Sequence, residues 1–182
     1  MGSTGPGGGI VFYDAGAKQL WGRYLEAAPT DYQVSNASAS VLWGCLGTLL
    51  GAIDTAIGTG KANTNTILTK CPTRPGIAAD VADKYSTSTV AAGQWFLPSR
   101  DELNELCKIY SNGRTDTGLY ASSQDGCTGS GNPTGGFSQY FCYWSSSETG
   151  GWTAYKQSFY WGDYINGAVK YIPCAVRPVR VL

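Results

Sequence analysis

The chain has 182 residues, of which 42% are hydrophobic, and its 13 basic and 13 acidic residues cancel. This length fits one domain with a core of its own, and no apolar run approaches the roughly 18 residues of a membrane-spanning helix. Neither charge sign forms the basic stripe typical of nucleic-acid binding or a polybasic membrane patch. We expect a monomer that binds no nucleic acid and does not insert into a membrane.

The sequence contains no histidine. This absence removes Ser-His and Cys-His nucleophile activation, histidine zinc ligands and imidazole proton transfer. The stretch IGTGKANT (57–64) resembles a phosphate loop, but such a loop needs four residues between its glycines and a final Lys-Ser/Thr pair. Carboxylate or lysine chemistry is formally open, yet the composition favours a protein that is no enzyme and uses neither a cofactor nor a metal.

Six cysteines allow fifteen pairings, and none has the close spacing of a metal site. They are either disulfides of an oxidising compartment or buried thiols. Cys45–Cys71 is the favoured bridge, because both residues flank one expected helical region, and Cys127–Cys142 is the second choice. We expect Cys107 to be a packed thiol within a helix. The first residues show no signal-peptide pattern, and a secreted or cell-surface location is favoured without being assigned.

In chain order, the first expected elements are strands at 10–13 and 23–27, which form a hairpin around an Asp-Ala-Gly turn. A turn of helix is predicted within 49–57, and a helix from about Lys61 to Lys70. A further helical stretch covers 77–85, where apolar residues recur at every fourth position.

The segment WFLPSRDELNELCKIY (95–110) carries the clearest local signal. Residues 95–97 predict a short strand, which Pro98 ends. Ser99 and Glu102 form a capping box at the start of an amphipathic helix. We assign Asp101 and Glu102 to this helix start, where the helix dipole favours acids, and not to a general acid/base couple.

Residues 111–142 are rich in Gly, Ser, Asn and Thr, which predicts a long surface excursion with a short strand at 119–122. The stretches YWSSS (143–147), AYKQSFY (154–160) and YIPCAVRPVRV (171–181) predict three successive strands of one sheet. Helices early and strands late indicate an α+β fold with a largely antiparallel sheet and two or more helices.

At this point the residues resemble a known family. The ordered motifs GPGGGIVFYD, GRYLEAAP, IGTGKANT, WFLPSRDELNEL, YWSSSE and VRPVR resemble the C-terminal domain family of bacterial collagen-like proteins. That family is related to the formylglycine-generating-enzyme-like branch of the C-type lectin fold. The resemblance implies one ligand-binding domain of this fold over residues 5–182.

The scaffold is also similar to the variable proteins of diversity-generating retroelements, in which an error-prone reverse transcriptase rewrites the 3′ coding end. It implies a candidate variable region, with its closing strand, at 143–182. Its framework positions would be Trp144, Ser145, Ser146, Ala154, Phe159, Gly162, Lys170, Val176, Arg177, Pro178 and Arg180. Its varying, ligand-binding positions would be Thr149, Gly150, Trp152, Tyr155, Tyr160, Trp161, Asp163, Tyr164, Asn166 and Tyr171.

The sequence departs from sugar-binding C-type lectins, because it lacks their Glu-Pro-Asn or Gln-Pro-Asp triplet and their Trp-Asn-Asp triplet. Calcium-dependent sugar binding is therefore not expected, and the catalytic cysteines of formylglycine-generating enzymes have no counterpart. Arg177 and Arg180 could recognise a carboxylate ligand, but structural pairing in the closing strand is favoured.

The aromatic residues of 149–172 are either core or contact surface. Trp144 and Phe159 fit inward-facing strand positions, whereas the consecutive Tyr160 and Trp161 cannot both be buried on one strand face. Tyr and Trp among Ser, Gly and Asn are typical of antibody-like binding surfaces. We therefore expect a non-catalytic receptor- or adhesin-like domain that binds a protein ligand; the alternative is an invariant structural or adhesive module of a cell-surface protein.

Overall fold

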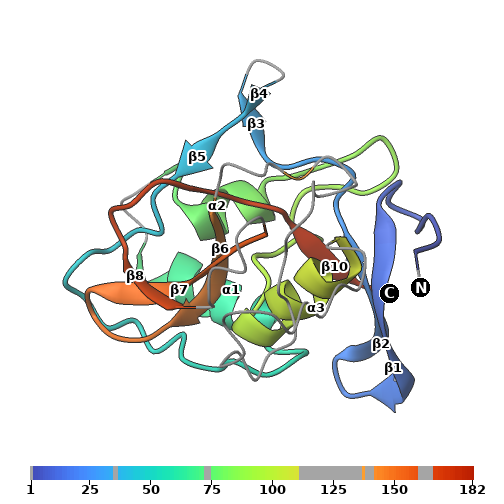
Figure 1. Ribbon diagram of the computed structural model, residues 1–182, viewed down its shortest axis with the longest axis horizontal. Helices are drawn as coiled ribbons and strands as arrows, with labels where there is room; N and C mark the ends of the chain where they lie inside the picture. Colours follow the sequence, from blue (N-terminus) through green and yellow to red (C-terminus); the bar gives the residue numbers. More distant parts are fainter. Residues whose placement is uncertain (1, 35–36, 72–74, 111–136, 138–141, 160–165) are drawn as a thin grey trace, which may run out of the picture.

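The structure is a computed structural model that describes residues 2–34, 37–71, 75–110, 137, 142–159 and 166–182 (Figure 1). The helices are α1 (Gly60–Lys70), α2 (Ala78–Asp83) and α3 (Arg100–Tyr110). The strands are β1 (Ile10–Gln19), β2 (Gly22–Ala27), β3 (Gln33–Val34), β4 (Ala37–Ser38), β5 (Ser40–Val41), β6 (Cys142–Glu148), β7 (Thr153–Ser158), β8 (Asn166–Val169), β9 (Cys174–Ala175) and β10 (Val179–Val181).

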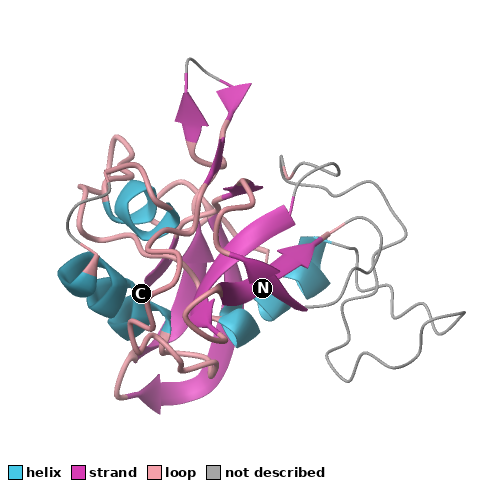
Figure 2. Cartoon of the chain, turned by 90° about the vertical axis from the view of Figure 1, so that its left-hand side faces the viewer, coloured by secondary structure: helices cyan, strands magenta, loops and turns pink. Residues whose placement is uncertain are grey.

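The strands form a five-stranded sheet of order β5-β9-β6-β7-β8 and a three-stranded sheet β1-β2-β10. The small hairpin β3-β4 projects from the rest of the described chain (Figure 2). Of the pairs between described strands, β6 with β9 is parallel and the others are antiparallel. The expected α+β class with a largely antiparallel sheet is therefore confirmed.

The five-stranded sheet separates two apolar clusters, because successive strand side chains point to opposite faces. Trp144 and Ala154 pack on one side with residues of α1 and α2. Tyr143 and Phe159 pack on the other side with leucines of α3 and with the β1–β2 hairpin. The prediction that Trp144 and Phe159 belong to the core is confirmed, since both are buried.

Local patterns predicted several elements correctly. The hairpin is present as β1 and β2, but its predicted Asp-Ala-Gly turn is wrong: β1 runs through residues 14–16 to Gln19, and the turn lies at 20–21. Helix α1 begins one residue before the predicted start, and α2 covers the middle of the expected 77–85. The capping box is confirmed: the Ser99 amide donates to Glu102 Oε2 (2.8 Å), and the Glu102 amide donates to Ser99 Oγ (3.3 Å).

Other local predictions are wrong. Residues 49–57 form no helix, because the Gly51 and Ala52 amides donate to the Glu148 carboxylate instead of to a helical carbonyl. Residues 95–97 make one isolated bridge, Phe96 with Val179, rather than a strand.

The closing segment is also not one strand. It splits into β9 and β10, which join different sheets, since Pro178 has no amide to donate and Arg177 turns into a buried ion pair. Strand β8 lay outside the predicted stretches and forms one edge of the five-stranded sheet. The expected strand at 119–122 lies outside the described residues.

The cysteine predictions have mixed outcomes. The Cys45–Cys71 disulfide is confirmed. The prediction of Cys127–Cys142 is wrong, because Cys142 pairs with Cys174. The Cα atoms of Cys142 and Cys174 are 5.0 Å apart, since β9 lies beside β6. Cys107 is disulfide-bonded and buried, so it is not a packed thiol.

Within the described residues, no helix has the length and apolar character needed to span a membrane.

Candidate ligand-binding surface

The ten predicted ligand-binding positions do not all fall within the described residues. Tyr160, Trp161, Asp163 and Tyr164 lie outside them, and Asn166 is described only as the first backbone position of β8. The structure therefore places Thr149, Gly150, Trp152, Tyr155 and Tyr171 in detail.

Four of these five lie together at one end of the β6–β7–β8 hairpins. The turn between β6 and β7 is closed by the amides of Thr149 and Gly150, which both donate to the Thr153 carbonyl. The Lys170 amide donates to the carbonyl of Trp152 (3.0 Å), which brings the end of β8 and Tyr171 alongside this turn. Trp152 is 64% exposed and Tyr171 is 59% exposed, so both side chains are accessible to a ligand.

Tyr155 is separated from this group by the alternation of β7. It pairs with Gly167, and its face of the sheet is the one that α3 covers. The Arg100 guanidinium at the start of α3 lies 5.5 Å from the centre of the Tyr155 ring. The pKa of Arg100 is raised, first by its hydrogen bond to Asp101 and also by Tyr155. Tyr155 is half-buried and partnered, so it does not belong to the same exposed surface.

The loop of residues 42–53, which was not among the predicted binding positions, lies beside Trp152. The Gly47 amide donates to the Gly151 carbonyl (2.9 Å), and a Cβ placed on Gly47 would be 3.6 Å from the Trp152 indole. This loop and its neighbours expose further large apolar side chains. Together we call them the apolar rim: Leu42, Leu46, Leu49, Ile53, Trp152, Tyr171 and Ile172.

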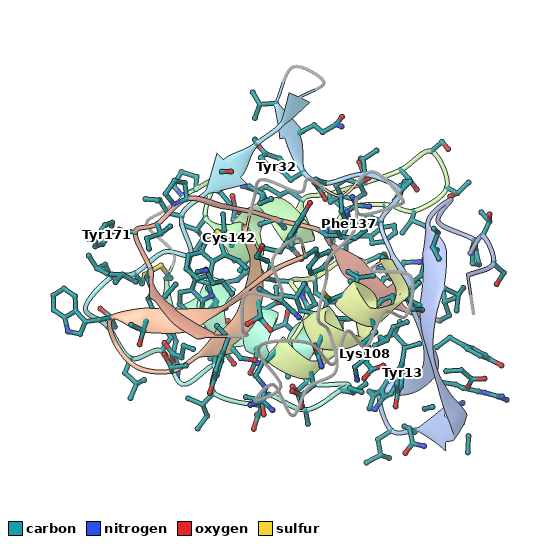
Figure 3. The ribbon with its side chains drawn as sticks, viewed as in Figure 1. Tyr13, Tyr32, Lys108, Phe137, Cys142 and Tyr171 are labelled. Carbon is teal, nitrogen blue, oxygen red and sulfur yellow. A yellow bond between two sulfur atoms is a disulfide. The ribbon has the colours of Figure 1, made fainter. Side chains whose placement is uncertain are left out.

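Figure 3 shows Tyr171 on the side of the molecule opposite Tyr13 and the β1–β2 hairpin. The sequence signal for the loop half of the rim is the leucine-rich run 42–50, whose leucines recur at i, i+4, i+7 and i+8, the spacing of one helical face, although Gly44 and Gly47 disfavour a helix there. Such a run is ordinarily taken as core, and exposure is what distinguishes it here.

A buried ion pair lies beneath the rim. Lys170 Nζ is 2.7 Å from Glu148 Oε2, and both side chains are fully buried. Lys170 Nζ also donates to the Thr48 carbonyl (3.0 Å) and lies 4.4 Å from the centre of the Trp43 ring. Glu148 Oε1 accepts from the amides of Gly51 and Ala52. Lys170, one of the framework positions that the resemblance implies, thus holds the loop 42–53 against the ends of β6 and β8.

Two further links fasten the same loop to α1. The Cys45–Cys71 disulfide joins the loop to the residue that follows the helix. Lys70, in the last turn of α1, donates to the carbonyl of Leu50. The loop is therefore held from both sides.

The two arginines of the closing segment are engaged inside the protein. Arg177 Nε donates to Asp31 (2.6 Å), and both side chains are fully buried. Arg180 Nε donates to Glu26 (2.8 Å), which also accepts the amides of Gly7 and Gly9. The structural pairing of both arginines is confirmed, although their partners lie in other segments of the chain.

The glycine-lysine stretch that resembles a phosphate loop is occupied by the protein's own carboxylate. Glu102 Oε1 accepts from the amides of Gly58 (2.7 Å) and Gly60 (3.4 Å), at the start of α1. Burial raises the pKa of Glu102 to about 7, against the hydrogen bonds from backbone amides, which lower it. This carboxylate joins the start of α3 to the start of α1, and the stretch serves the framework.

The described residues contain no cluster of three or more His, Cys, Asp or Glu side chains that is placed to hold a metal ion. The chain matches no family model and no curated protein. The fold and the surface define a class: a small α+β domain in which buried ion pairs and disulfides support an exposed apolar rim.

Proposed function

We propose that the chain is a non-catalytic binding domain that recognises a protein ligand through aromatic side chains at the strand ends. The observation that carries this proposal is the exposure of Trp152 and Tyr171 on a rigid support formed by Glu148 and Lys170. Large aromatic side chains dominate protein-binding hot spots, and they lose little conformational entropy on binding because they have only two rotatable side-chain bonds.

We further propose the C-type lectin fold, in its formylglycine-generating-enzyme-like branch, and the role of a variable protein of a diversity-generating retroelement. A contrast in burial supports this. Most framework positions that the structure describes are buried: Trp144, Ser145, Ser146, Ala154, Phe159, Lys170, Val176, Arg177 and Pro178. Trp152 and Tyr171, which would vary, are exposed. Variation is tolerated at exposed positions and destabilises buried ones.

A secreted or cell-surface location is part of the same proposal. The disulfides Cys45–Cys71 and Cys142–Cys174 support it, because disulfides persist in oxidising compartments and are rare in the reducing cytosol.

Sequencing the 3′ coding end from many cells of the source population tests the variable-protein role. We expect changes at Trp152 and Tyr171, and at the predicted positions of 160–166, with Phe159 and 176–180 constant. An invariant 3′ end would favour the alternative of a fixed structural or adhesive module.

Binding itself is tested by display. We expect wild-type protein to select peptides from a random displayed library, and Trp152→Ala and Tyr171→Ala to lower their retention about tenfold with the melting temperature kept within a few degrees. Leu20→Ala is the matched control, since Leu20 is fully exposed in the turn between β1 and β2, away from the rim. Equal retention by wild type and both aromatic variants would contradict the proposal.

A further inference from the structure

Three uncharged segments of the chain meet at the apolar rim. Residues 42–53, 149–154 and 171–173 contain no Asp, Glu, Lys or Arg. Backbone hydrogen bonds join them: Gly47 to Gly151, Trp152 to Lys170, and Lys170 to Trp43. Segments distant in sequence thus combine into one surface with the same chemical character.

The charges nearest the centre of this surface are withdrawn from solvent. Glu148 and Lys170 are fully buried and neutralise one another. Asp54 follows the loop, and Lys70 donates to the carbonyl of Leu50 near the same end. A centre depleted in charge with polar groups at its border is the arrangement of protein–protein interfaces.

Two side chains of the loop, Leu49 and Ile53, are as exposed as the aromatic side chains of the rim. Leu49 is 64% exposed, the same fraction as Trp152. Gly47 and Thr48 contact the β6–β7 turn and Lys170, so Leu46 and Leu49 flank residues that touch the aromatic half of the rim.

We propose that the loop 42–53 is a second half of the binding surface, and that the rim accepts an uncharged segment of a partner protein that carries aliphatic and aromatic side chains. Charge complementarity selects this occupant, because a charged partner residue placed on the rim would lose hydration, and the described residues of the rim carry no opposite charge. This inference rests on the proposed function and adds to it the contribution of the loop and the chemistry of the ligand.

The rigidity of the loop makes this contribution favourable. The Cys45–Cys71 disulfide, the Glu148 contacts to Gly51 and Ala52, and the Lys170 contact to Thr48 hold the backbone before any partner arrives. A pre-organised surface pays less conformational entropy on binding than a loop that has to be ordered.

The test uses a random peptide library displayed on phage, selected on the full chain. We expect the enriched peptides to be rich in aliphatic and aromatic residues and poor in charge. We expect Leu46→Asp and Leu49→Asp each to lower their retention at least about tenfold, as Trp152→Ala does. Leu20→Asp is the control for adding a charge at an exposed leucine.

The outcomes are distinguishable. Loss of retention in Trp152→Ala with full retention in both loop variants would overturn the inference and leave the proposed function in place. Enriched peptides with a strong excess of one charge would overturn it equally. Full retention in all of these variants would contradict the proposed function itself.

Two other possible occupants of the rim, a second copy of the chain and a lipid surface, are tested by separate measurements on the wild type and Leu49→Asp. Dimerisation in sedimentation velocity that Leu49→Asp abolishes would mean that a second copy covers the rim, and would overturn the inference. Binding to neutral phosphatidylcholine vesicles that Leu49→Asp abolishes would assign the rim to lipid, and would overturn it too. We expect a monomer and no vesicle binding.

Discussion

Lys170 and Glu148 form an ion pair of 2.7 Å in which neither side chain is exposed to solvent. Removing one member of such a pair leaves the other charge buried without its partner. We expect Lys170→Met to lower the free energy of unfolding by about 3–5 kcal/mol, measured by urea denaturation.

The matched control is Lys84→Met, the same substitution in an exposed i,i+4 pair with Asp80. We expect a cost of less than about 0.5 kcal/mol there. Similar costs at the two lysines would mean that Lys170 does not hold the rim as the structure indicates.

A second prediction concerns the pH dependence of stability. Burial raises the pKa of Glu102 from its ordinary 4.5 to about 7 in the folded protein. Between these values the folded state binds more protons than the unfolded state, so the contribution of this group to stability falls as the pH rises. The fall amounts to about 3 kcal/mol between pH 4.5 and pH 7, since each pKa unit corresponds to about 1.4 kcal/mol.

Glu102→Gln isolates this contribution, because the glutamine does not titrate. We expect the unfolding free energy of wild type minus that of the variant to decrease from pH 4.5 to pH 7 and then to level off. A difference that increases with pH would show that the amide hydrogen bonds from Gly58 and Ser99 outweigh the burial of the carboxylate.

Local chemistry explains which parts of the fold were predictable from the sequence. Ser99 and Glu102 are three residues apart, so the start of α3 follows from a short motif. The placement of β9 between β5 and β6 depends instead on contacts between distant segments. The Cys142–Cys174 pairing is a consequence of that placement, and spacing along the chain could not reveal it.

The candidate surface was predictable only in part for a related reason. Trp152 follows from its glycine-rich surroundings and from the family resemblance, whereas Tyr171 follows from the resemblance alone. The exposure of Leu46 and Leu49 does not, because a leucine-rich run predicts burial. Tyr155 was grouped with the exposed aromatics, although strand alternation places it toward α3.

The N-terminal glycines allow a third prediction. A Cβ placed on Gly9 would lie 1.7 Å from the carbonyl oxygen of Ala27, a backbone atom that the β1–β2 pairing holds in position. Gly9→Ala must therefore displace the segment whose amides donate to Glu26. We expect a loss of stability at least about 2 kcal/mol greater than that of Gly8→Ala, measured by urea denaturation.

Gly8 is the neighbouring control. Its φ is +82° and a Cβ there meets nothing within 4 Å, so alanine would add only backbone strain of about 1–2 kcal/mol. Equal losses at the two positions would mean that the Gly9 contact is not maintained in solution.

The last prediction separates the stability of the rim loop from that of the whole domain. Replacing Cys45 and Cys71 together by alanine opens a bridge with a sequence separation of 26, which should cost about 3 kcal/mol. Hydrogen exchange should accelerate more at the Gly47 amide, which donates to Gly151, than at the amide of Val179. Val179 belongs to the three-stranded sheet, and its amide donates to Phe96. Equal acceleration at both amides would show that the disulfide stabilises the domain as a whole and that the rim loop keeps its position without it.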